Sequence, residues 1–209
     1  MKIGVLIPDR NDRPQFLRHC LRMIGRQSLK PDFVFVVNYE PTSEDFDLTQ
    51  RVRKGFEILK NKGADVILIM ENDDYYRETY IETMVREFIA AGEPFIFGTD
   101  FTIYYHVKKR EFRKLVHSGR ASLMNTLLRI DAPIIWPSDS EIYLDLFLWS
   151  QINGKTFTPK ENISLGIKHG VGLCGGSGHN GMRFDNQDFN FKFLKSVVDE
   201  ERFNFYSSL

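Results

Sequence analysis

Three short apolar runs recur in the first third of the chain, and a helix-length segment separates each run from the next. The runs lie within residues 2–7, 33–37 and 66–70 and are rich in Val, Ile, Leu and Phe. Runs of this length and composition are typical of strands buried on both faces of a parallel sheet. Because the order is strand–helix–strand with short connections, the sequence predicts an α/β fold with a mostly parallel, Rossmann-like central sheet and helices on both faces.

The segments between the runs carry helix signals. Apolar residues recur at helical spacing over 14–27, a segment that begins with a proline and has Asp12 as a possible N-cap. Further helices are predicted over 48–60, which Gly63 would end as a C′ glycine, and over 77–91. These helices supply the crossovers that parallel strands require.

The pattern changes in the second half of the chain. A fourth strand is expected over 94–98, and segments 101–107 and 112–117 are expected to pair as a small antiparallel hairpin. A helix is expected over 138–152, with Ser138 as its cap.

Regular patterns fade beyond Gly154. Residues 166–181 contain seven glycines, two histidines and one cysteine. We expect such a glycine-rich loop either to be disordered without a ligand or to act as a lid that closes over one.

Composition sets broad limits on function. Lys plus Arg equals Asp plus Glu at 28 each among 209 residues, so no global field attracts the chain to nucleic acid or to an anionic membrane. The two cysteines lie far apart and form no CxxC pair. The chain has no apolar stretch that approaches the roughly 20 residues of a membrane span, and no secretion signal is recognisable. We therefore expect a cytoplasmic protein of one domain.

The acidic segment Glu71-Asn72-Asp73-Asp74 directly follows the third apolar run. Ligands of open α/β sheets bind beyond the carboxyl ends of the strands. Three carboxylates at such a place repel one another unless a cation lies between them, and Mg²⁺ or Mn²⁺ prefers such oxygen ligands. The sequence therefore predicts a divalent metal site here. The alternative is a polar turn in which Asp74 caps the following helix.

Several motifs occur in an order that resembles one enzyme family. They are Ile7-Pro8-Asp9-Arg10-Asn11-Asp12-Arg13-Pro14, Cys20-Leu21, Gln27-Ser28-Leu29-Lys30-Pro31, Val36-Val37, the acidic segment followed by Tyr75-Tyr76, and Asp145-Leu146-Phe147-Leu148-Trp149. Over about residues 3–150 the chain is similar to nucleotide-sugar glycosyltransferases with the GT-A fold, of the family 2 type.

The resemblance implies one GT-A domain over residues 1–209. In it, 1–100 would be the half that binds the nucleotide sugar, 101–165 would be the acceptor side, and 166–209 would form the glycine-rich loop and tail. The implied reaction is metal-dependent transfer of a sugar from a nucleotide diphosphate sugar, a UDP-sugar, to an acceptor hydroxyl with inversion.

The resemblance also assigns roles to individual residues. Asp145 occupies the position of the family's catalytic base; Glu141 lies four residues earlier, on the same face of the expected helix, and stays open as an alternative, with Asp139 as a weaker one. Glu71, Asp73 and Asp74 would hold Mn²⁺ or Mg²⁺. His169 would complete the metal shell or touch the diphosphate, and His179 is the other histidine in that loop.

The donor would meet residues at the ends of the first three strands. Pro8, Asp9 and Arg10 would contact the base and ribose, although Arg10 could equally be a solvated loop charge. Lys168 would bind phosphate, and Asn72 belongs to the same donor site. The second strand ends in Asn38-Tyr39 where the family usually has acidic residues; Asn38 can still bond a uracil edge, and Tyr39 can stack on the base.

The acceptor stays open between a saccharide, a glycolipid and a modified nucleic acid. The basic segment 108–114, with His117 and Arg120 beyond it, could grip an anionic acceptor, including hydroxylated bases of viral DNA, or it could be a solvated hairpin tip. A nucleotidyltransferase is an alternative enzyme. The lack of a glycine-rich phosphate loop after the first strand counts against it. A non-catalytic module that binds nucleotide sugars is the alternative from another class.

Overall fold

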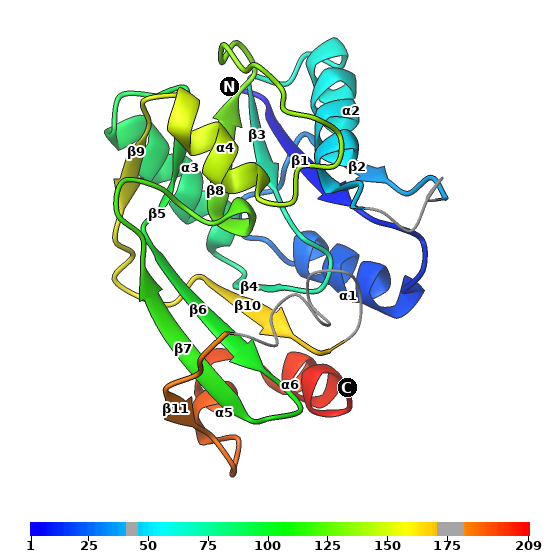
Figure 1. The fold of residues 1–209 in the computed structure, drawn as a ribbon, viewed down its shortest axis with the longest axis vertical. Coiled ribbons are helices and arrows are strands. Elements are labelled where there is room, and N and C mark those ends of the chain that lie inside the picture. The colour runs from blue at the N-terminus through cyan, green and yellow to red at the C-terminus, as the bar shows by residue number, and fades with distance from the viewer. Residues whose placement is uncertain (41–45, 171–181) are drawn as a thin grey trace.

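The computed structural model describes residues 1–40, 46–170 and 182–209. Its central sheet contains six strands, in the spatial order β2-β1-β3-β8-β5-β9 (Figure 1). In chain order these strands are β1 Ile3–Pro8, β2 Phe33–Val37, β3 Val66–Ile69, β5 Ile96–Thr99, β8 Thr126–Arg129 and β9 Lys155–Phe157.

The central sheet is parallel apart from one reversed strand. β1 pairs in parallel with β2 and with β3, and β5 pairs in parallel with β9. β8 runs antiparallel between β3 and β5. The prediction of a mostly parallel sheet is confirmed. Because β8 is reversed, the residues that precede it, and not those that follow it, lie beside the carboxyl end of β3.

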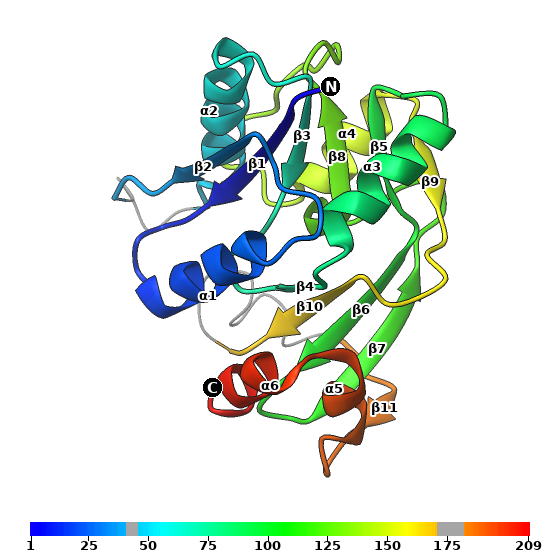
Figure 2. The same ribbon diagram turned by 180° about the vertical axis from the view of Figure 1, so that it is seen from behind.

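Helices cover both faces of this sheet, as predicted. On one face α1 (Pro14–Gly25) and α3 (Tyr80–Ala90) bury apolar side chains against Val5 and Leu68 (Figure 2). On the other face α2 (Leu48–Asn61) and α4 (Leu144–Gln151) pack against Leu6 (Figure 1). Alternate residues of one strand therefore point into two cores, which explains why the strands read as continuous apolar runs.

The predicted hairpin is confirmed and belongs to a second, five-stranded sheet of order β11-β7-β6-β10-β4. In chain order its strands are β4 Tyr75–Tyr76, β6 Phe101–His106, β7 Glu111–Val116, β10 Ser164–Lys168 and β11 Asn186–Gln187. β10 pairs in parallel with β6 and antiparallel with β4. This sheet lies below the carboxyl ends of β1 and β3 in Figure 1.

Two sequence-based boundaries were wrong. Asp74 does not cap a helix, because Tyr75–Tyr76 form β4 and α3 begins only at Tyr80. The helix expected over 138–152 begins at Leu144, so Ser138 does not cap it and Glu141 lies before it. Glu141 instead accepts a hydrogen bond from the hydroxyl of Thr49 through its backbone carbonyl, at 2.9 Å.

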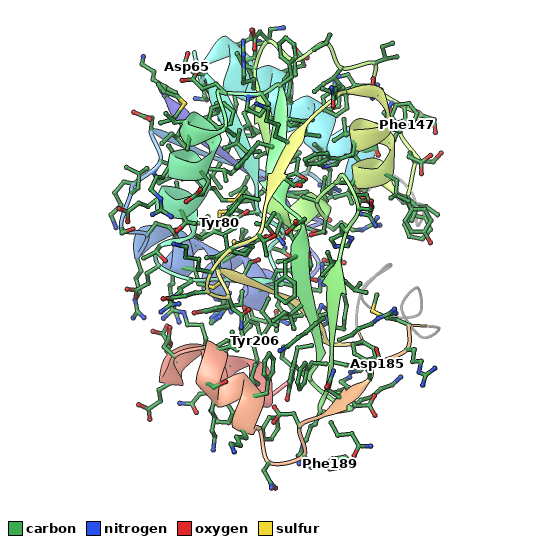
Figure 3. The ribbon with its side chains drawn as sticks, turned by 90° about the vertical axis from the view of Figure 1, so that its left-hand side faces the viewer. Asp65, Tyr80, Phe147, Asp185, Phe189 and Tyr206 are labelled. Carbon is green, nitrogen blue, oxygen red and sulfur yellow. The ribbon has the colours of Figure 1, made fainter. Side chains whose placement is uncertain are left out.

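The region beyond Gly154 is more regular than expected. It contains β9, β10, β11 and two C-terminal helices, α5 (Lys192–Val197) and α6 (Glu200–Ser207). Part of the glycine-rich segment is β10, and its residues 171–181 lie outside the described residues. In Figure 3, Tyr80 and Tyr206 lie inside the molecule, whereas Phe189 lies at its edge with 58% of its surface exposed. None of the helices in the described ranges is long and apolar enough to cross a membrane.

Candidate active site

A cavity of about 390 Å³ lies between the carboxyl ends of the central strands and the second sheet. Eight of the residues that the sequence singled out line it: Pro8, Arg10, Glu71, Asn72, Asp73, Asp74, Asp145 and Lys168. The first strand supplies Pro8, the loop after β3 supplies the acidic segment, β10 supplies Lys168 and α4 supplies Asp145. The cavity therefore gathers residues from distant parts of the sequence.

Asp73 lies at the centre of a cluster on one wall. Its Oδ2 accepts a hydrogen bond from Nη1 of Arg13 at 3.1 Å and lies 2.9 Å from Nε2 of His169. The same Arg13 nitrogen lies 3.1 Å from Nε2 of His169. Burial alone would raise the pKa of Asp73, but the contact with His169 and the charge of Arg13 outweigh it and lower that pKa. Asp73 is therefore held as a carboxylate.

The donor atoms of Asp73 and His169 suit a divalent metal ion. Carboxylate oxygen and imidazole nitrogen are both ligands of Mn²⁺, and carboxylate oxygen suits Mg²⁺. Among the residues that the structure describes, no group of three or more His, Cys, Asp or Glu side chains gathers to hold a metal. An ion at this place would take its remaining ligands from a diphosphate and from water, as Mg²⁺ commonly does. The residues present fit a metal that binds together with its substrate.

The other two acids of the segment are held differently. Asp74 is 2% exposed, and its Oδ1 accepts a hydrogen bond from the backbone N–H of Ile167 at 2.7 Å. This bond ties the acidic loop to β10. Burial and the charge of Asp73 raise the pKa of both Asp74 and Glu71. That Glu71 and Asp74 bind the metal stays a prediction.

Lys168 brings a positive charge into the same wall. Its ammonium group lies 4.9 Å from the centre of the Tyr104 ring. Burial would lower its pKa, but the charges of Asp74, Tyr104 and Glu71 outweigh burial and raise that pKa, so the ammonium stays charged. A charged lysine beside a carboxylate cluster suits a phosphate ligand.

At the end of β1, Asp9 is buried and does not belong to the described lining of the cavity. The side-chain amide of Asn72 donates a hydrogen bond to it, and so does the backbone N–H of Asn11, at 3.1 Å. Burial raises the pKa of Asp9. Asp9 thus fixes Asn72 and the loop after β1, and its contact with the donor stays a prediction.

Arg10 lines the cavity and is not a solvated loop charge. It donates to Asp47 at 2.9 Å, and its side chain is 17% exposed. The buried Arg51 contacts the same carboxylate at 2.7 Å and donates to the backbone carbonyl of Asp9 at 2.6 Å. Arg10 is therefore positioned by α2 at the cavity wall.

Asn38 and Tyr39 directly follow β2. Neither is among the described residues that line the cavity. The hydroxyl of Tyr39 donates to Gln50 at 2.7 Å, and the guanidinium of Arg51 lies 4.1 Å from the centre of its ring. Their contact with a base stays a prediction.

Asp145 also lines the cavity, in the first turn of α4. Its Oδ2 accepts a hydrogen bond from Nη1 of Arg120 at 2.9 Å. Burial raises the pKa of Asp145 in spite of this cation. A carboxylate with a raised pKa beside a cavity is suited to accept a proton.

The other two candidate bases lie elsewhere. Glu141 is not part of the described cavity lining, and its carboxylate accepts the backbone N–H of Tyr143 at 2.9 Å. Asp139 forms an ion pair with Arg53 at 2.8 Å. The structure therefore places Asp145, of the three, at the cavity.

Sequence reasoning missed two arginines of the site, Arg13 and Arg120. Arg13 lies in the same loop as Arg10, so the rule that places ligands beyond strand ends could have found it. Arg120 follows the hairpin, and the sequence singled it out only together with the basic segment that could grip an anionic acceptor. His117, also in the lining, lies 3.2 Å from the hydroxyl of Thr102, and burial lowers its pKa to about 4.

Part of the basic hairpin tip makes contacts within the protein. Lys108, Lys109 and Arg110 are exposed, but Arg110 donates to the carbonyl of Phe189 at 3.1 Å and lies over the ring of Phe191. The structure does not test whether this tip binds an acceptor. His179 lies outside the described residues.

Comparison with solved structures identifies the fold. The chain is similar to S. aureus TarS 1–349 in complex with UDP-GlcNAc, with a TM-score of 0.55 and 15% identity over 85% of this chain and 61% of that one. It is also similar to TarS 1–349 in complex with UDP, with a TM-score of 0.53 and 15% identity over 80% of this chain and 60% of that one. The chain thus spans about six tenths of the length of these TarS chains.

TarS is a GT-A-type glycosyltransferase, so the resemblance inferred from the motifs is confirmed at the level of the fold. No protein-family model and no curated protein sequence matches this chain.

Proposed function

We propose that this protein transfers a sugar from a UDP-sugar to an acceptor hydroxyl, with Mn²⁺ or Mg²⁺ and with inversion at the sugar. The observation that carries the proposal is one cavity in which the pKa values of two carboxylates are shifted in opposite directions. Asp73 is kept charged by His169 and Arg13, whereas burial raises the pKa of Asp145. The first environment suits the diphosphate end of a donor, and the second suits a general base.

Asp145 and Asp73 have different roles in the proposed chemical step. Asp145 accepts the proton of the acceptor hydroxyl as that oxygen attacks the anomeric carbon and the bond from this carbon to the diphosphate breaks. A divalent ion between Asp73 and His169 would act as a Lewis acid that neutralises the leaving diphosphate. Lys168 adds a second positive charge at this wall. A single displacement with one base inverts the anomeric centre.

The nucleotide and the acceptor are proposed from separate observations. Uridine is supported by the TarS structures, which hold UDP and UDP-GlcNAc. For the acceptor, Ile142, Tyr143 and Leu146 are exposed large apolar residues beside Asp145, and all three line the cavity. An aromatic and aliphatic rim suits the apolar face of a sugar ring, so we propose a saccharide or glycolipid acceptor.

Calorimetric binding of UDP, with GDP and CDP as controls, tests the donor site. We expect UDP to bind more tightly than GDP or CDP, to need Mn²⁺ or Mg²⁺, and to be lost in Asp73→Ala. Metal-dependent hydrolysis of a UDP-sugar without acceptor would separate an enzyme from a binding module. Absence of binding to all three nucleotides would contradict the proposed function.

A further inference from the structure

Arg13 occupies part of the space in which a metal ion held by Asp73 and His169 would lie. Nη1 of Arg13 lies 3.1 Å from both Oδ2 of Asp73 and Nε2 of His169, which are 2.9 Å apart. An ion bound by these two atoms would lie about 2.1 Å from each. On the side of these two atoms from which Arg13 approaches, the guanidinium nitrogen and the ion would overlap. We propose that Arg13 is a tethered cation that occupies the metal position and must leave it before the divalent ion binds.

Several contacts hold Arg13 in this position. It is the residue before Pro14, so the start of α1 fixes its backbone. Its guanidinium lies 5.3 Å from the centre of the Phe16 ring, and that ring lies 4.6 Å from the ring of His169. The side chain is 16% exposed. Arg13 and His169 are therefore packed on the same aromatic ring and approach Asp73 together.

The chemistry of arginine makes it an effective substitute for the ion. A guanidinium cannot lose its proton in a protein, so its charge does not depend on pH in the working range. Without a cation, Asp73 would repel the neighbouring carboxylates Glu71 and Asp74 in a buried loop. Arg13 therefore keeps this loop formed before metal arrives, and it competes with the metal afterwards.

The donor then supplies what makes the exchange favourable. A diphosphate offers Arg13 a new anionic partner with geometry that suits a guanidinium, and it offers the ion further oxygen ligands. Asp12 already lies 3.3 Å from the Nε of Arg13 and provides a second place for the displaced charge. Metal binding and nucleotide binding should thus be coupled through Arg13, and the coupling must be reciprocal. This inference rests on the proposed function, because it takes the metal from there.

Calorimetric titration with Mn²⁺ in the absence of nucleotide tests the competition. We compare the wild type with Arg13→Gln and with the matched control Arg18→Gln, which changes an exposed arginine of the same helix. Removal of the competing charge should raise the affinity of Arg13→Gln for Mn²⁺ about tenfold or more, and Arg18→Gln should stay near the wild type. Equal or weaker Mn²⁺ binding by Arg13→Gln would overturn the proposal.

The same titration with saturating UDP tests the coupling. It also distinguishes failure of the proposed metal site from failure of the proposed role of Arg13. UDP should increase the affinity for Mn²⁺ by a larger factor in the wild type than in Arg13→Gln. If neither protein binds Mn²⁺ even with UDP, the metal part of the proposed function fails and the tethered-cation role fails with it. If both bind Mn²⁺ with equal affinity throughout, the metal site stands and only the role of Arg13 is wrong.

A measurement on the unmodified protein covers the case in which Arg13→Gln does not fold. The Nε–H resonance of Arg13 can be assigned in a ¹H–¹⁵N spectrum as the arginine signal that Arg13→Lys lacks. Saturation with Mg²⁺ and UDP should shift this resonance, because the guanidinium changes partners. A resonance that stays in place while Mg²⁺ binds would contradict the proposal.

Discussion

Two similar arginine–carboxylate pairs line the cavity, and the pKa values of their acids are shifted in opposite directions. Arg13 donates to Asp73 at 3.1 Å, and Arg120 donates to Asp145 at 2.9 Å. The exposed fractions of the two carboxylate side chains are similar, at 18% and 20%. Yet the pKa of Asp73 is lowered, and the pKa of Asp145 is raised.

The surroundings of the two pairs explain the difference. Burial raises the pKa of both acids, but Asp73 also has His169 against it and Lys168 nearby. For Asp145, the charge and hydrogen bond of Arg120 and backbone hydrogen bonds oppose burial but do not outweigh it. One arginine therefore does not decide the charge state of a half-buried acid; the sum of the charges around it does.

Replacement of the acid on the cationic wall should have the largest effect. Asp73→Asn removes the charge that Arg13 and His169 surround, so we expect sugar transfer to fall about 10³-fold or more and metal-dependent UDP binding to be lost. Steady-state rates and calorimetry would measure both. Asp139→Asn, which changes an acid paired with Arg53 outside the described cavity lining, is the control and should keep its activity.

Replacement of the second acid, in Asp145→Asn, should slow the chemical step without weakening UDP binding. We expect kcat to fall about 10²-fold to 10³-fold, because the acceptor hydroxyl loses its general base, while the Kd for UDP stays unchanged. Glu141→Gln should change kcat little. A normal rate in Asp145→Asn together with a slow Glu141→Gln would reassign the base.

Removal of Arg120 should widen the difference between the pKa values of Asp145 and Asp73, which a pH profile can detect. Asp145 must be deprotonated to act as a base, and the charge of Arg120 favours the deprotonated form. In Arg120→Gln the pKa of Asp145 should therefore rise further, and the acidic limb of the kcat/KM profile should move about one unit to higher pH. Tyr104 and Glu71 also interact electrostatically with Asp145, and this variant retains both residues. Arg120→Lys keeps the charge and should restore the limb; an unshifted limb in Arg120→Gln would show that Arg120 only packs.

The smallest effect concerns the bond that joins the acidic loop to β10. Asp74→Ala leaves the buried N–H of Ile167 without its acceptor and should lower the free energy of unfolding by about 1–3 kcal/mol. Asp74→Asn keeps an oxygen at that point and should cost less. Urea denaturation of both variants measures the difference. Equal losses in both would mean that the charge of Asp74, and not its hydrogen bond, stabilises this wall.

Much of the scaffold could be predicted from local patterns. Apolar runs gave β1, β2 and β3, and the carboxyl-end rule put the acidic segment at the cavity. Gly63 ends α2 with a φ of 83°, as its position after the helix predicted. Local propensity carries this information because each element forms from residues adjacent in the sequence.

What could not be predicted depends on distant partners. Tyr75–Tyr76 resemble a helix start, but β10 pairs with them and makes them a strand. β10 itself was hidden by glycine content; Gly166 lies in it because a Cβ there would be 2.5 Å from the Tyr104 ring. Arg13 meets Asp73 across 60 positions of the sequence; the strand-end rule puts both loops at one edge of the sheet but does not say which side chains pair.

The reversal of β8 determines which loop beside the cavity can change independently of the others. Because β8 enters the sheet backwards, the segment that precedes it, with Arg120 and Leu123, lines the cavity beside the end of β3. Donor-side loops follow their strands, whereas this loop leads into its strand from the hairpin. Changes of its length or composition can therefore reshape the rim near Asp145 while the loops after β1 and β3 keep their anchors. Under the proposed function, this loop is accordingly the place to change acceptor preference while the proposed donor site stays unaltered.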